Sequence, residues 1–206
     1  MIFYDRAFES GSEKLSELAE LMGIEIGEGM KGIEVEELFL KREKEIARQN
    51  YKGNALTIQT VNFDSILIEV ASYLFDQEGV KLLSQNIYKL RSFIWFKHQR
   101  QEKLVEEAFN RVVKDTDLFI RILGVMAEIF EEVEPKYFAE LKENFEEFDK
   151  KYGKENLSGL KKKFSTRSLQ EESRSRNLAR MMWLIFGVVF VILVIMIFLK
   201  LIKHSL

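Results

Sequence analysis

The sequence has 206 residues, which is enough for one folded domain and a further segment. Hydrophobic residues make up 47% and charged residues 31%, a composition typical of globular rather than disordered chains. Because the sequence contains no cysteine, it excludes disulfides, Cys-bound zinc, iron–sulfur clusters and thiol nucleophiles.

Charge is distributed unevenly along the chain. Residues 1–153 contain 30 Asp/Glu against 21 Lys/Arg, whereas residues 154–180 contain 8 basic and 3 acidic residues. Affinity for nucleic acids comes mainly from basic side chains, so the acidic part argues against nucleic-acid binding. We therefore expect an acidic, mainly helical domain over 1–153 and a basic, serine-containing juxtamembrane tether over 154–180.

The first third of the domain mixes helical periodicity with short alternating runs. Leucine spacing behind a capping-box pattern predicts a helix over 13–22. Apolar and polar residues then alternate on both sides of a glycine-containing loop, which predicts a small β-hairpin over 24–35. A charged helix is expected over 36–50, and β-branched residues predict a short strand over 55–61.

Helical spacing returns after Asp64, which is the expected N-cap of a helix that ends at 77–79. Residues 80–114 contain no helix breaker and keep a helical period, except in the polar stretch 97–103. A straight helix of this length would extend about 50 Å, which is longer than a domain of this size is wide. We therefore expect two helices or one kinked helix.

The end of the domain carries an aromatic stripe. Asp115 begins a capping cluster for an apolar helix over 118–133, and Pro135 suits the first turn of another helix. On that last helix, apolar residues recur every three or four positions, at Phe138, Leu141, Phe145, Phe148 and Tyr152. Such a stripe is more often core than a seam for a partner helix. Trp95, Phe138 and Phe145 are nevertheless the candidate partner contacts, because exposed aromatic residues dominate interfaces.

The C-terminal segment predicts a membrane anchor. Residues 181–199 contain no charge and no proline, and as a helix they would extend about 28 Å, close to the hydrocarbon core of a bilayer. We expect a transmembrane helix over 181–202, with a short tail at 203–206. Arg180 and Trp183 are the expected interfacial residues on one side, and Lys200 extends to the opposite interface.

Orientation follows from the basic residues. Seven Lys/Arg lie in 161–180, whereas Lys200 and Lys203 are the basic residues that follow the apolar segment. Basic residues stay on the cytoplasmic side of a membrane, and the N-terminus does not resemble a signal peptide. We therefore expect a single-pass, tail-anchored protein of the cell membrane with its N-terminal domain in the cytoplasm.

Catalytic motifs are scarce in this sequence. The histidines are His98 and His204, and neither lies in a triad or a metal-ligand pattern. Carboxylates are frequent over 128–149, and a metal-dependent, membrane-attached enzyme could use them. The favoured hypothesis is a non-enzymatic interaction or scaffolding protein, or a subunit of a membrane assembly, with membrane lipid and a protein as partners and no cofactor. A membrane-active, toxin-like protein is the lesser alternative.

Overall fold

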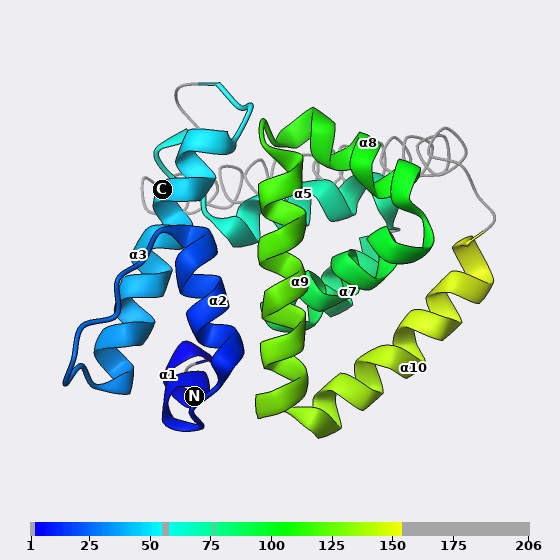
Figure 1. The fold of residues 1–206 in the computed structure, drawn as a ribbon. Coiled ribbons are helices and arrows are strands. Elements are labelled where there is room, and N and C mark those ends of the chain that lie inside the picture. The colour runs from blue at the N-terminus through cyan, green and yellow to red at the C-terminus, as the bar shows by residue number, and fades with distance from the viewer. Residues whose placement is uncertain (1–2, 55–57, 76, 154–206) are drawn as a thin grey trace, which may run out of the picture. The chain divides into compact units, whose positions relative to one another are not determined.

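The computed structural model describes residues 3–54, 58–75 and 77–153, and within these ranges helices joined by short loops make up most of the chain (Figure 1). Its helices are α1 (Phe3–Glu9), α2 (Glu13–Met22), α3 (Gly32–Asn50), α5 (Phe63–Leu74), α6 (Gln77–Ser84), α7 (Ile87–Arg100), α8 (Glu102–Val112), α9 (Thr116–Val133) and α10 (Pro135–Tyr152). The mainly helical class predicted from the sequence is confirmed for this part of the chain.

The predicted β-hairpin over 24–35 is wrong. Residues 24–31 form an irregular loop, and the second half of the expected hairpin belongs to the first turn of α3. The Lys31 N–H donates to the Glu34 carboxylate at 2.8 Å, which caps this helix in the way a capping box does. Val35 and Phe39 lie one turn apart and are both fully buried, so the apolar spacing serves a helix.

The predicted strand over 55–61 is not present where the structure describes it. Residues 58–61 contain no strand, and residues 55–57 lie outside the described part of the chain. The one extended pairing in the described residues is an isolated antiparallel bridge between Tyr51 and Val113.

Two helices in the middle of the domain, α5 and α6, begin at other residues than the sequence predicted. Asn62, not Asp64, caps α5, because its side chain accepts the Ser65 N–H at 2.7 Å. Gln77 begins α6 instead of ending the previous helix. The predicted break in the polar stretch 97–103 is confirmed, since α7 ends at Arg100 and α8 begins at Glu102. The expectation of two helices over 80–114 is wrong, because α6 ends at Ser84 and the Asn86 side chain caps a separate helix, α7.

The core of the described domain lies between α9 and the helices around it. α9 packs against α2 and α1 on one side and against α7 and α10 on the other (Figure 1). Its buried side chains recur at helical spacing, and they include Phe119, Ile122, Leu123, Met126, Ile129 and Phe130. Each large apolar side chain buried in this way contributes about 1.5–3 kcal/mol.

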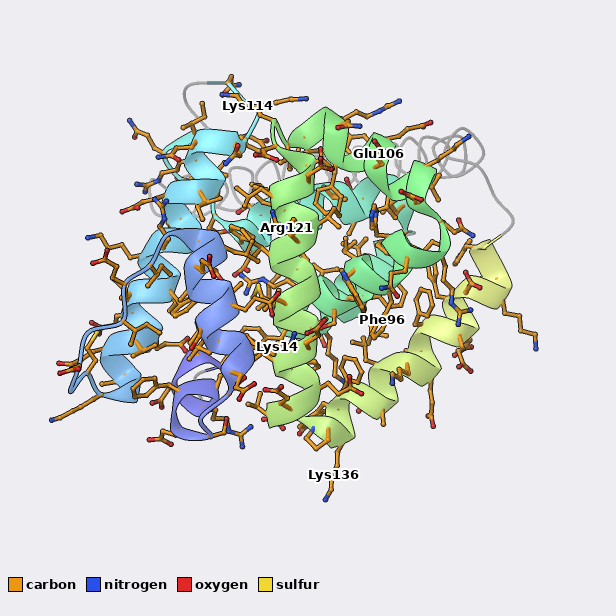
Figure 2. The ribbon with its side chains drawn as sticks, viewed as in Figure 1. Lys14, Phe96, Glu106, Lys114, Arg121 and Lys136 are labelled. Atoms are coloured by element: carbon orange, nitrogen blue, oxygen red, sulfur yellow. The ribbon has the colours of Figure 1, made fainter. Side chains whose placement is uncertain are left out.

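α10 closes one side of the domain. Phe138, Leu141 and Phe145 of its stripe are buried against α7 and α9, so the core interpretation of these three residues is confirmed. Phe96 of α7 points toward α10 and lies 5.3 Å from the Phe138 ring and 5.8 Å from the Phe145 ring (Figure 2).

None of the helices described within residues 3–153 is long and apolar enough to cross a membrane. The predicted tether over 154–180, the predicted span over 181–202 and the tail over 203–206 lie outside the described residues, as do Arg180, Trp183 and Lys200.

Candidate functional site

α7 carries two buried cations, and the first is Arg91. Its guanidinium donates from Nη2 to Glu43 of α3 at 2.8 Å and to Asp64 of α5 at 2.9 Å. Glu43 also accepts the Tyr4 hydroxyl of α1. Four helices therefore meet in one buried network of charged and hydrogen-bonded side chains.

The network favours a charged Arg91. Burial opposes its charge, but the nearby carboxylates of Glu43 and Asp64 raise the pKa of the guanidinium above its usual value. Burial, together with the Glu43 carboxylate, raises the pKa of the Tyr4 hydroxyl, so this group stays a neutral donor. The groups neutralise and orient one another, which assigns the network a structural role in holding α1, α3, α5 and α7 together.

Lys97, the second buried cation of α7, has a much poorer environment. Its ammonium lies 3.8 Å from the Asp149 carboxylate and 4.6 Å from the centre of the Phe148 ring, and it forms no hydrogen bond within the described residues. Burial lowers the pKa of Lys97 to about 8, and Asp149 opposes this shift in part. The contact between α7 and α10 thus includes a cation that is poorly compensated.

A hollow of about 480 Å³ opens between α6, α7 and α10. We call it the α6–α10 groove. Its apolar lining consists of Leu82, Leu83, Phe93, Phe148 and Tyr152, and its polar lining of Gln85, Asn86, Lys89, Glu140, Asn144, Glu147 and Lys151. Leu82 is 68% exposed, which is the largest exposure of a large hydrophobic side chain in the described residues. An apolar floor with polar groups around it is typical of a binding surface.

A second hollow of about 380 Å³ lies next to the groove and shares Gln85 and Asn86 with it. These two residues form the turn between α6 and α7. Tyr137 lines this second hollow and is 51% exposed, and Lys89 lies 5.4 Å from the centre of its ring. The two hollows and the exposed side chains beside them make this side of α7 the best candidate for contact with another molecule.

Comparisons with protein-family models, with curated proteins and with solved structures give no match.

The three aromatic residues predicted as partner contacts lie around α7 and α10. Phe138 and Phe145 are each 4% exposed, and their rings face α7. Trp95 is half-buried and packs on α9, where a Cβ added at Gly124 would lie 2.7 Å from its indole nitrogen. A partner contact through these residues stays a prediction.

The carboxylates over 128–149 do not converge. Each of several has a different partner: Glu128 pairs with Lys14, Glu131 with Lys142, Glu134 with Arg6, Glu140 with Lys89, and Asp149 with Arg100. No three His, Cys, Asp or Glu side chains of the described residues lie in an arrangement that could hold a metal ion. The structure thus gives the metal-dependent alternative no supporting geometry in this region.

Sequence reasoning missed the groove and the Arg91 network. Leu82 and Leu83 are adjacent apolar residues in a short helix, and their position in the chain gives no sign that one of them is exposed. Tyr4, Glu43 and Arg91 are separated by 39 and 48 positions, so no local spacing connects them.

Proposed function

We propose that this chain is a tail-anchored, single-pass protein of the cell membrane whose cytoplasmic helical domain binds a protein partner and catalyses no reaction. The observation that carries the proposal is the uncharged segment 181–199 preceded by seven Lys/Arg in 161–180. An apolar segment of this length matches the bilayer core, and basic residues before it retain the domain on the cytoplasmic side.

The α6–α10 groove supports the binding part of the proposal. Leu82 projects an apolar side chain into solvent beside a hollow large enough for one or two partner side chains. Burying such a leucine against a partner contributes about 1.5–3 kcal/mol, and the amides of Gln85, Asn86 and Asn144 can supply directional hydrogen bonds around it.

The anchor is tested by fractionation. The full-length chain expressed in cells should stay with the membrane pellet after extraction with alkaline carbonate, because a helix that spans the bilayer is not released by high pH. Deletion of 181–206 should release the domain into the supernatant. If the full-length chain is extracted as completely as the deletion variant, the anchor proposal is wrong.

The groove is tested with a matched pair of substitutions. Leu82→Asp places a charge in the groove, whereas Ile68→Asp places the same charge on α5, where Ile68 is 39% exposed. Proteins crosslinked to the detergent-solubilised full-length chain should be lost with Leu82→Asp and kept with Ile68→Asp. Equal losses in the two variants would contradict a partner site at the groove.

A further inference from the structure

The isolated bridge between Tyr51 and Val113 joins the end of α3 to the turn between α8 and α9. The Lys52 N–H donates to the Val112 carbonyl at 2.9 Å, and the Lys114 N–H donates to the Asn50 carbonyl at 2.8 Å. Side chains alternate along extended backbone, so Lys52 and Lys114 project from the face of the bridge opposite to Tyr51 and Val113. The bridge thus brings together two cations that are far apart in the sequence.

Two further cations extend this group, Arg48 in the last turn of α3 and Arg111 in the last turn of α8. We call Arg48, Lys52, Arg111 and Lys114 the junction cluster. All four are exposed. Within the described residues none of the four forms an ion pair with a carboxylate, whereas Lys14, Arg42, Lys89, Arg100 and Lys142 all do.

Backbone carbonyls hold three of these side chains without neutralising them. Arg48 donates to the Gln59 carbonyl at 3.0 Å, Lys114 donates to the Gln49 carbonyl at 3.3 Å, and Lys52 donates to the Asn110 carbonyl. The nearest acidic neighbour in the sequence is Asp115, whose carboxylate accepts the Leu118 N–H at the start of α9. The cluster therefore presents positioned, unpaired positive charge on a domain that is acidic in total.

The opposite end of α3 is strongly acidic. Residues 25–37, which lead into α3 and form its beginning, contain five Glu against one Lys, and four of these glutamates are exposed. We call this region the acidic pole. α3 has 19 residues and is therefore about 28 Å long, several times the screening length of about 8 Å at physiological salt. Lys114 lies at the C-terminal end of α3, where its N–H bonds the Asn50 carbonyl, whereas the acidic pole lies at the N-terminal end of this helix (Figures 1 and 2).

We propose that the junction cluster binds the anionic headgroups of the membrane that anchors the chain, and that it thereby docks the domain with the acidic pole turned away from the lipid. This inference rests on the proposed membrane anchor. An anionic surface attracts the cluster and repels the acidic pole, so one orientation of the tethered domain is favoured. Each basic residue near such a surface contributes about fivefold to the docking equilibrium.

The test uses the full-length chain in vesicles of phosphatidylcholine alone and of phosphatidylcholine mixed with phosphatidylserine. The chain has no cysteine, so one introduced cysteine can carry a fluorophore. Gln49→Cys reports on the junction cluster and Glu28→Cys, in the exposed loop before α3, on the acidic pole. Energy transfer to an acceptor lipid should rise at position 49 with phosphatidylserine and should not rise at position 28. Equal transfer at the two positions would overturn the proposal.

A matched pair of charge reversals then assigns the effect to the cluster. Lys52→Glu with Lys114→Glu should reduce the docking equilibrium at least 25-fold, at about fivefold or more per position. Lys136→Glu with Lys150→Glu changes the net charge equally on α10 and should leave the transfer at position 49 unchanged. Circular dichroism confirms that each variant is helical. Equal losses in the two double variants would contradict the proposal.

Two controls separate this proposal from its alternatives. Flotation of the chain with phosphatidylcholine vesicles after carbonate extraction reports on the anchor alone, and its loss would contradict the proposed function. In that case the junction cluster is tested separately, by measuring whether the charge reversals weaken binding of the chain to vesicles that contain phosphatidylserine. Inorganic phosphate at constant ionic strength should not displace the docked domain. Displacement would show that the cluster binds free phosphate rather than a bilayer, and would overturn the proposal.

Discussion

The two buried cations of α7 lie six residues apart and have opposite environments. Arg91 is paired with Glu43 and Asp64, and its pKa is raised. Lys97 has one carboxylate 3.8 Å away and no hydrogen bond within the described residues, and its pKa is lowered to about 8. The same helix thus contains a cation that its surroundings stabilise and a cation that its surroundings destabilise.

The difference separates a fixed from a weakly fixed part of the domain. The Arg91 network joins α1, α3, α5 and α7 through charge-assisted hydrogen bonds, which are roughly twice as strong as neutral ones. The contact of α7 with α10 depends on the aromatic stripe and includes the destabilised Lys97 ammonium. We therefore expect α10, which forms one side of the groove, to separate from the domain more easily than α1, α3 or α5.

The largest expected effect is that of Arg91→Met. The substitution leaves the Glu43 carboxylate buried without its cation, and breaking a buried pair in this way destabilises by about 3–5 kcal/mol. Urea unfolding monitored by circular dichroism measures the loss. Arg100→Met is the control on the same helix, because Arg100 is 54% exposed and should contribute less than about 1 kcal/mol. Similar losses for the two variants would contradict the comparison.

Lys97→Met should have the opposite sign. Replacement of a poorly compensated buried cation by an apolar side chain of similar length is neutral or stabilising by about 1–3 kcal/mol near pH 7. The effect should also depend on pH. The pKa of Lys97 is about 8 in the folded chain, whereas an unburied lysine has a pKa of 10.5. Between these two pH values the unfolded chain therefore binds more protons than the folded chain.

The wild-type chain should therefore gain stability relative to Lys97→Met as the pH rises from about 8 toward 10. Unfolding free energies of both chains at about pH 7, 8 and 9, which are equally spaced around that pKa, measure the gain. Tyr51 and Tyr88 have raised pKa values, so their ionisation lowers the stability of the folded chain above pH 10. This contribution is the same in both chains and cancels when their unfolding free energies are subtracted. A difference that is constant with pH would show that Lys97 is not destabilised by burial.

Asp149→Asn should have a smaller effect. Asp149 is 26% exposed, and its loss removes the nearest negative charge from Lys97. We expect a destabilisation of about 1 kcal/mol at pH 7 and a further decrease in the pKa of Lys97. Glu131→Gln is the control, since Glu131 pairs with Lys142 at 3.5 Å and both side chains are more than half exposed. NMR titration of the Lys97 side chain follows its pKa, and an unchanged value would contradict the assignment.

The smallest effect on stability is expected for Leu82→Asp. A side chain that is 68% exposed contributes little to folding, so its unfolding free energy should lie within about 0.5 kcal/mol of wild type. Thermal unfolding measures this. A large destabilisation would show that Leu82 belongs to the core and is not available to contact a partner at the groove.

Local signals in the sequence predicted much of the helical framework. The helix over 13–22, the Asp115 cap and the start of α10 at Pro135 were predictable because they depend on neighbouring residues. The hairpin prediction failed because short apolar alternation also fits the first turn of a capped helix. Lys31 and Glu34 supplied that cap.

The candidate site could not be predicted in the same way. Lys97 lies in the polar stretch 97–103 and is nevertheless fully buried, because α10 covers it from more than 40 positions away in the sequence. The exposure of Leu82 and the pairing of Arg91 likewise depend on the packing of distant helices. Such features follow from tertiary structure, whereas caps and helical periods follow from the local chain.

The proposed anchor of the chain in a bilayer by residues 181–202 is tested most directly by the behaviour of the purified full-length protein. The account predicts that it stays in solution only with detergent or lipid, and that in sealed vesicles with the cytoplasmic face outward a protease removes the domain of 1–153. A full-length chain that is monodisperse in plain buffer, without lipid or detergent, would contradict it.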